Sequence, residues 1–304
     1  MKKNKALDRS ATGSSKAAPA AIAQPVQPVS QDSAHEIRPG QSIELLKELH
    51  ILTRDGKLNQ DSRRKLKQVY HLYQFIEPLM QAAQQQHAEI TLVDHGAGKS
   101  YLGFILYDLY FKSQAGKSHI YGIETRDELV SRSQELATRL GFSGMSFLNL
   151  SVAQSIGSAA LPEKINIVTA LHACNTATDD AIEFALKKKA DYIVLVPCCQ
   201  AEVAATLKKN KSADIKANPM SELWRHPIHT REFGSQLTNV LRCLQLEAHG
   251  YHVSVTELVG WEHSMKNELI IATNKNLPGH HARQRLAEVL KSTGLETLQH
   301  RFFC

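Results

Sequence analysis

The sequence predicts an α/β protein with a mostly parallel sheet, a terminal antiparallel hairpin and additional N-terminal helices. From about residue 88, short runs rich in Val, Ile and Leu alternate with amphipathic stretches, as in parallel strands that are buried on both faces. A Gly-rich turn follows the first of these runs. The last two runs, YHVSVTELVG and NELIIATN, are separated only by WEHSMKN, which is too short for a crossover helix. We therefore expect these two strands to pair antiparallel.

Further helices are expected before the first strand and after the last strand of the sequence. SIELLKELHIL and DSRRKLKQVYHLYQFIEPLMQAAQQQ carry apolar residues at helical spacing, and Pro78 should bend or divide the second helix. HARQRLAEVLKSTGLETLQ is a further candidate near the C-terminus. The predicted domains are a disordered tail (1–38), a helical extension (39–87), the main α/β domain (88–275) and a C-terminal helical extension (276–304).

Composition limits the class of protein. The 304 residues are 42% apolar, enough for one large core, and no apolar run reaches the roughly 18 residues of a membrane span. We therefore expect no membrane partner. The five cysteines are an odd number and two are adjacent, which favours a reducing, cytoplasmic location over a set of disulfides. The oligomeric state is left open.

The charge of the chain is unevenly distributed. The formal net charge is +6, and half of it lies in residues 1–40, which hold six basic and three acidic residues. This Ala-, Pro- and Gln-containing tail lacks the apolar segment of a signal peptide and should be disordered. The positive charge is compatible with an RNA partner, although the folded part contributes only the other half.

A cofactor site is predicted at the first two strand ends. TLVDHGAG places Asp94 at the end of a strand, with Gly96 and Gly98 in the turn that follows. Glycines let this backbone turn tightly and approach a ligand closely. Glu124 ends the next strand, where a carboxylate can accept both ribose hydroxyls of an adenosine. His95, Asn149 and Leu171, at the ends of the first, third and fourth strands, complete the predicted cofactor set.

Two other nucleotide motifs fit poorly. A phosphate-binding P-loop needs a glycine where this chain has Val93, and a dinucleotide fingerprint needs a small residue where it has Tyr101. Five parallel strands followed by a hairpin are instead the order of S-adenosylmethionine-dependent methyltransferases. We therefore expect S-adenosylmethionine as cofactor, with Asp94 near its positively charged sulfonium and amine.

The ends of the fourth and fifth strands carry a second group of polar residues. Because neighbouring parallel strands end at the same edge, His172, Cys174 and the pair Cys198 and Cys199 should converge there. DHGAGKSYLG, LHACNTATDDAI and VPCCQ, in this order, resemble the class I methyltransferase domains of methyltransferase-like and glutathione S-transferase C-terminal domain-containing proteins. They are also similar to the eukaryotic acceptor-stem tRNA 2′-O-methyltransferases, in which a histidine stands at the position of Gln200.

The resemblance covers roughly residues 88–275 and implies roles for particular residues. It implies cofactor roles for Asp94, Gly96, Gly98 and Glu124. It implies roles in the reaction site for the following residues: His172, Cys174, Asp179, Pro197, Cys198 and Cys199. Glu262 and His263, in the loop of the terminal hairpin, are further candidates for catalysis.

Several chemical interpretations of the histidine and cysteines remain open. His172 or a loop residue could orient or deprotonate a hydroxyl nucleophile while the cysteines shape the wall. A cysteine could instead attack a pyrimidine carbon, as in RNA cytosine-5 methyltransferases. A metal site is a third possibility, but adjacent cysteines do not have the spacing of zinc ligands, so no metal is expected. The thiols could also be purely structural.

The leading functional hypothesis is therefore methyl transfer to RNA, with tRNA or rRNA as the expected acceptor. One alternative keeps the cofactor but methylates a protein or a small molecule. Another is a non-catalytic module that binds the cofactor without turnover.

Overall fold

The computed structural model describes residues 37–54, 56, 58, 60–114, 118–171, 176–197, 201–258 and 268–303. The strands are β1 (Thr91–His95), β2 (His119–Glu124), β3 (Met145–Asn149), β4 (Ile167–Leu171), β5 (Tyr192–Val196), β6 (Tyr251–Glu257) and β7 (Glu268–Asn274). The helices before β5 are α1 (Ile43–Glu48), α2 (Gln60–Gln86), α3 (Tyr101–Leu109), η2 (Phe111–Ser113), α4 (Asp127–Arg139), α5 (Val152–Ile156) and α6 (Ala177–Lys187). Those after it are α7 (Glu202–Ala217), η3 (Pro219–Trp224), α8 (Pro227–Ala248), α9 (His280–Ser292), η4 (Glu296–Leu298) and α10 (Gln299–Phe302).

The strands form one sheet in the order β3-β2-β1-β4-β5-β7-β6. The pairs β3–β2, β2–β1, β1–β4 and β4–β5 are parallel, whereas β7 runs antiparallel to both β5 and β6. The predicted sheet and its terminal hairpin are thus confirmed. All five parallel strands end at one edge, which we call the carboxyl edge.

Each face of the sheet is covered by helices. On one face, α2, α3 and part of α4 pack with buried side chains such as Tyr73 and Phe104. On the other face, α5 and α6 contribute a second core that includes Phe184. Burial on both faces explains the near-continuous apolar sequence of the central strands.

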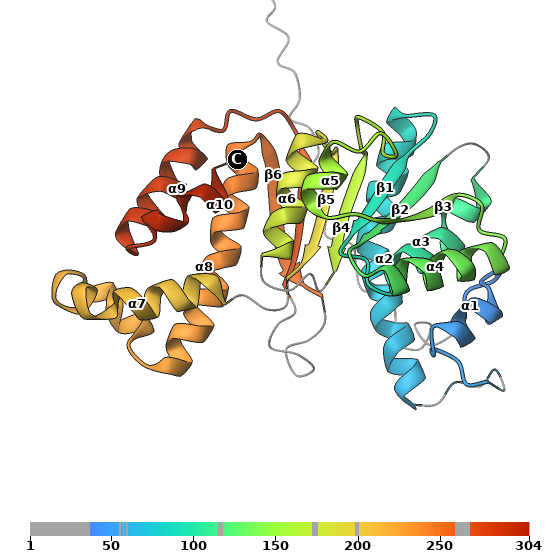
Figure 1. The fold of residues 1–304 in the computed structure, drawn as a ribbon, viewed down its shortest axis with the longest axis horizontal. Helices are drawn as coiled ribbons and strands as arrows, with labels where there is room; N and C mark the ends of the chain where they lie inside the picture. The colour runs from blue at the N-terminus through green and yellow to red at the C-terminus, as the bar shows by residue number, and fades with distance from the viewer. Residues whose placement is uncertain are drawn as a thin grey trace, which may run out of the picture.

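A third apolar core, not foreseen from the sequence, lies among helices at the β6 side of the molecule. α7, η3, α8, α9 and α10 enclose Trp224, Leu241 and Leu290, all of which are essentially inaccessible to solvent. Figure 1 shows α7 with the start of α8 on one side, and α1 with the start of α2 on the other, extending past the carboxyl edge at the bottom of the view. The carboxyl edge is therefore flanked by two helical projections.

Of the two effects expected of Pro78, a bend or a division of the helix, the division is wrong. α2 is a single helix that continues through Pro78 rather than being divided there. A proline inside a helix removes a backbone hydrogen bond at a cost of about 3 kcal/mol or more. Burial of Ile76, Met80 and Ala83 against the sheet offsets this cost. In the described part of the chain, no helix has both the length and the apolar character needed to cross a membrane.

Candidate functional site

The loop after β1 depends on left-handed backbone. Gly96 and Gly98 have φ angles of +67° and +58°, and Ser100 at the start of α3 has +50°. A residue with a Cβ is strained at such angles, so the two glycines are needed for the shape of the loop. The Ala97 N–H donates to the carbonyl of Ile123 at 2.9 Å, which fixes the loop over the end of β2.

Glu124, the last residue of β2, faces this loop. Its carboxylate accepts hydrogen bonds from the backbone N–H of Gly98 at 2.8 Å and from Nε of Arg126 at 3.0 Å. Burial by itself raises the pKa of Glu124, but the hydrogen bonds from Arg126 and Gly98 lower it to about 2. The side chain is therefore an ionised acceptor near neutral pH, beside the glycine loop. Its place at the end of β2 agrees with the sequence analysis, and its role toward a ribose stays a prediction. Arg126 is a partner that the sequence analysis missed, although the letters ETR place a cation two residues after the acid.

Asp94 is buried between its own strand, β4 and the start of α3. Its carboxylate is 3% exposed and accepts a hydrogen bond from Oγ1 of Thr169 in β4 at 2.8 Å. Burial raises the pKa of Asp94 to about 7, against the lowering effect of Thr169 and the backbone N–H of Gly103. This acid thus ties β1 to β4 and α3, and its charge is sensitive to any cation that approaches the loop.

His95 is a buried side chain with unused hydrogen-bonding capacity. Both ring nitrogens are shielded from solvent and have no hydrogen-bond partner among the described residues, and the ring lies 5.5 Å from that of Phe184 in α6. Burial lowers the pKa of His95 to about 4, although the charge of Glu124 acts in the opposite direction. The imidazole is therefore neutral near pH 7 and keeps one donor and one acceptor for a ligand.

The other predicted cofactor residues lie along the same edge. Asn149 pairs with Glu124 in the β2–β3 register, and its Nδ2 donates to Oδ1 of Asp127 at 3.1 Å. Leu171 ends β4 and pairs with Val196 at the end of β5. The structure therefore brings the predicted cofactor residues together at the carboxyl edge, and their roles remain predictions.

The residues proposed for catalysis fall outside the described part of the chain. These are His172, Cys174, Cys198, Cys199, Glu262 and His263. Among the described residues, no group of three or more His, Cys, Asp and Glu side chains could hold a metal ion. Cys243 is described, and burial, with the nearby Glu268 and Glu247, raises the pKa of its thiol to about 12. A thiol of this kind is unsuited to nucleophilic attack.

The residues that flank these segments form a buried polar network. Asp179, near the start of α6, accepts hydrogen bonds from Nε and Nη2 of Arg242 in α8 at 2.6 and 2.9 Å. Nη1 of Arg242 also donates to Asn239 at 3.2 Å, and Asn239 in turn donates to Glu268, the first residue of β7. Asp179, implied by the resemblance to be a site residue, is thus engaged in an ion pair. Arg242 lies in no recognisable sequence motif, so its pairing with Asp179 could not be predicted from the sequence.

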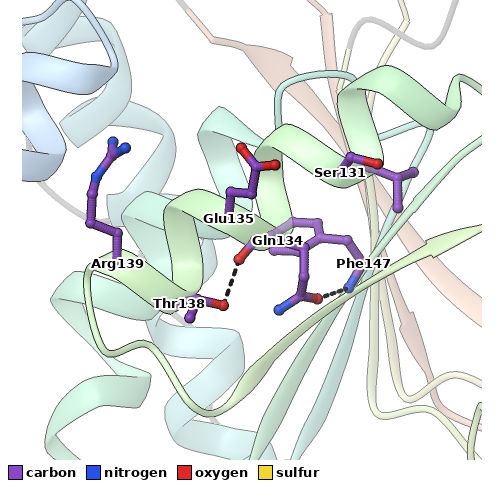
Figure 2. A pocket seen from close by; sticks show the side chains of 7 residues that line it. Ser131, Gln134, Glu135, Thr138, Arg139 and Phe147 are labelled. Carbon is purple, nitrogen blue, oxygen red and sulfur yellow. Dashed lines mark hydrogen bonds between the residues drawn. The ribbon is translucent and has the colours of Figure 1, made fainter.

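A shallow pocket of about 560 Å³ lies away from this edge. Figure 2 shows its lining on the outer side of α4 and along the edge strand β3, where Oε1 of Gln134 accepts from the backbone N–H of Phe147 at 3.4 Å. This contact pairs an outward N–H of β3 that would otherwise be open to another strand. Neither the glycine loop nor Glu124 lines the pocket, so we assign it no cofactor role.

The strand order and the glycine loop define the class of the fold. A seven-stranded sheet ordered 3-2-1-4-5-7-6, with β7 antiparallel, is the Rossmann-like sheet of class I methyltransferases. Residues 64–206 match the profile of a family described as a methyltransferase domain. Over these residues the chain is therefore similar to the methyltransferase domains of this family.

Curated relatives support the same assignment. The glutathione S-transferase C-terminal domain-containing protein of Bos taurus is 25% identical over 246 residues, which are 73% of this chain and 35% of that protein. The Homo sapiens protein of the same name is 26% identical over 239 residues, with the same coverage of 73% and 35%. The chain thus spans about a third of the length of these relatives.

Solved structures of similar shape include an rRNA methylase from Streptococcus thermophilus. It is 12% identical, with 61% of this chain and 87% of that chain covered and a TM-score of 0.39. A SAM-dependent methyltransferase from Aquifex aeolicus is 16% identical, with 64% and 89% covered and a TM-score of 0.37. The assignment of the fold rests on the strand order and not on these two likenesses.

Proposed function

We propose that this chain is an active S-adenosylmethionine-dependent methyltransferase whose acceptor is RNA. The observation that carries the first part is the position of Glu124, an ionised carboxylate held 2.8 Å from the backbone N–H of Gly98. A carboxylate at the end of the second strand, beside a left-handed glycine loop, is placed to accept the hydroxyls of an adenosine ribose.

The residues of the carboxyl edge fit the chemical groups of this cofactor. Ribose hydroxyls would donate hydrogen bonds to the Glu124 carboxylate, which now accepts from Arg126. The left-handed glycine loop lets the backbone approach the ligand closely. The two ring nitrogens of His95, which make no hydrogen bond to other described residues, offer one donor and one acceptor in the wall of the site. Asp94 would gain stability as a carboxylate beside a cation.

When bound, the cofactor supplies an electrophilic methyl group on a positively charged sulfonium. The chain must orient the acceptor in line with that methyl group and remove a proton from it. We propose His172, which directly follows β4, as the residue that orients or deprotonates the acceptor. Cys198 and Cys199 directly follow Pro197 at the end of β5, and we propose that they shape the same wall.

Positive charge on the projection formed by α1 and the start of α2 supports RNA as the acceptor. Arg63, Arg64, Lys65 and Lys67 are exposed at the start of α2, while Leu66 between them packs inward. Exposed Lys208 and Lys209 on α7 add positive charge to the projection on the other side. Cations that flank a reaction site can position the phosphates of a nucleic acid without reading its sequence.

Transfer of a tritiated methyl group tests both parts of the proposal. The protein is incubated with labelled S-adenosylmethionine and, separately, with total RNA and with total protein from cells that lack it. We expect label in RNA, located by nucleoside analysis, and much less with the Glu124→Ala variant when S-adenosylmethionine is supplied near the dissociation constant of the wild type. Label in protein alone would assign the other acceptor class. Cofactor binding without transfer to any pool would show a binding module.

A further inference from the structure

Two adjoining pockets form a groove next to the glycine loop. One, of about 290 Å³, lies between the end of α1, the start of α3 and α4; the other, of about 580 Å³, lies along the segment between α1 and α2. Glu48 and His50 line both pockets, so the two pockets adjoin at these residues. The groove begins at Lys99, which follows Gly98 directly, and reaches Ser62 at the start of α2.

The groove is electropositive. Lys47, Arg54, Lys99 and Arg132 line it, and none of them has an ion-pair partner among the described residues. Of its two acids, Glu48 is paired with Arg139, whose Nη2 lies 2.6 Å from its Oε1. Figure 2 shows Arg139 reaching from α4 toward the N-terminal helices, which is the side on which this pair forms. Among the described residues that line the groove, uncompensated cations therefore outnumber uncompensated acids.

The groove also presents an aromatic ring. Tyr101, the first residue of α3, lines the pocket next to Lys99 and is 39% exposed, unlike the buried tyrosines of the core. An exposed aromatic face beside cations is the combination with which proteins hold single-stranded nucleic acids, since bases stack on the ring and phosphates contact the basic side chains. A purely anionic ligand without bases would make no use of the ring.

We propose that this groove binds a single-stranded segment of the acceptor RNA and leads it to the cofactor loop. Lys47, Arg54 and Arg132 would contact phosphates, and Tyr101 would stack on a base. The proposal rests on the proposed function, in which the acceptor is RNA. It adds the path by which that acceptor approaches the carboxyl edge.

Binding of a short, fluorescein-labelled single-stranded oligoribonucleotide to the full chain tests the groove. The variant Arg54→Glu/Arg132→Glu reverses two exposed groove charges outside the cofactor residues. The matched control, Arg283→Glu/Lys291→Glu, reverses two exposed charges on α9, which Figure 1 shows on the far side of the molecule. We expect the groove variant to bind at least about tenfold more weakly at about 50 mM salt, with a slope of log affinity against log salt shallower by about one per lost phosphate contact. Calorimetry should show unchanged affinity for S-adenosylmethionine in both variants.

A second variant separates RNA from other polyanions. Tyr101→Ala should bind the oligoribonucleotide roughly fivefold or more weakly, because it loses a stacked base, while binding of heparin stays unchanged. Tyr101→Phe should restore binding of the oligoribonucleotide. If the wild type binds RNA and the groove variants lose no more affinity than the α9 control, the groove proposal is overturned and RNA remains the acceptor. If the wild type binds no RNA, both proposals are overturned.

Discussion

Arg242 of α8 holds both carboxylate oxygens of Asp179 of α6 in a buried, bidentate ion pair. The two contacts measure 2.6 and 2.9 Å, and the side chains of Arg242 and Asp179 are 1% and 8% exposed. Through Asn239 the same guanidinium is linked to Glu268 at the start of β7. The guanidinium of Arg242 therefore holds α6, α8 and the start of β7 together. α6 follows the segment after β4, and β7 follows the loop of the hairpin.

Removal of this cation should be strongly destabilising. Arg242→Met leaves the Asp179 carboxylate buried without its partner, at an expected cost of about 3–5 kcal/mol in the free energy of unfolding. Urea denaturation measures this cost. The matched control is Arg285→Met, which breaks the exposed pair with Glu247 and should cost less than about 1 kcal/mol. Equal losses in the free energy of unfolding for the two variants would show that the buried ion pair stabilises the fold no more than the exposed one.

Glu124 should decide cofactor affinity. Glu124→Ala removes a charged acceptor of hydrogen bonds, which is worth about 1.5–3 kcal/mol, or roughly 10- to 150-fold in the dissociation constant of S-adenosylmethionine. Isothermal titration calorimetry gives the constant. Glu128→Gln, an exposed acid in the first turn of α4, is the matched control and should leave it unchanged. An unchanged constant in both Glu124→Ala and Gly96→Val would exclude this cofactor site.

Asp94 should make stability and cofactor affinity depend on pH in opposite directions. Its pKa is raised from 3.8 to about 7 by burial, so the folded protein holds this proton more tightly than the unfolded chain. The contribution of Asp94 to the free energy of unfolding therefore falls as pH rises from about 4 to about 7, and is level above that. Affinity for the cationic cofactor should instead increase up to about pH 7, because binding favours the carboxylate.

Asp94→Asn should remove both trends. Calorimetry at about pH 6 and about pH 8 compares the affinities, and adenosine, which lacks the sulfonium and the amine, serves as the control ligand. A cofactor affinity that rises equally in the wild type and in Asp94→Asn would assign the titration to another group.

His95 should be a residue that lowers stability in the absence of ligand. Replacement of its unpaired buried nitrogens in His95→Leu should raise the free energy of unfolding by about 1 kcal/mol near pH 7 and weaken cofactor binding. Because burial lowers the pKa of His95 from 6.5 to about 4, its protonation destabilises the fold as pH falls between these values. Because Asp94 acts in the opposite direction over this pH range, the difference from His95→Leu isolates the effect. As pH falls from about 6.5 to about 4, the wild type and the exposed control His226→Leu should both lose stability relative to His95→Leu.

Substitutions at the predicted reaction site distinguish the chemical interpretations. We expect His172→Ala to lose nearly all methyl transfer, and Cys198→Ser and Cys199→Ser to keep part of it, because a serine can replace a thiol that only packs. Tritium transfer to RNA measures the activity, with cofactor affinity as the control for folding. Complete loss in either cysteine variant would instead indicate a nucleophilic thiol. Full activity in His172→Ala would direct attention to Glu262 and His263.

The sequence by itself determined the succession of strands, the hairpin, the glycine loop and the acids at the first two strand ends. These features are local: a strand buried on both faces must be apolar, and a left-handed turn requires glycine. Only the tertiary structure decided where those acids point. Asp94 turns inward to Thr169 and Glu124 faces Gly98, since each partner comes from another part of the chain. The Arg242–Asp179 pair joins residues 63 positions apart, and the core around Trp224 joins helices from both sides of the hairpin. Such contacts depend on how the helices pack, which no local pattern of residue types encodes.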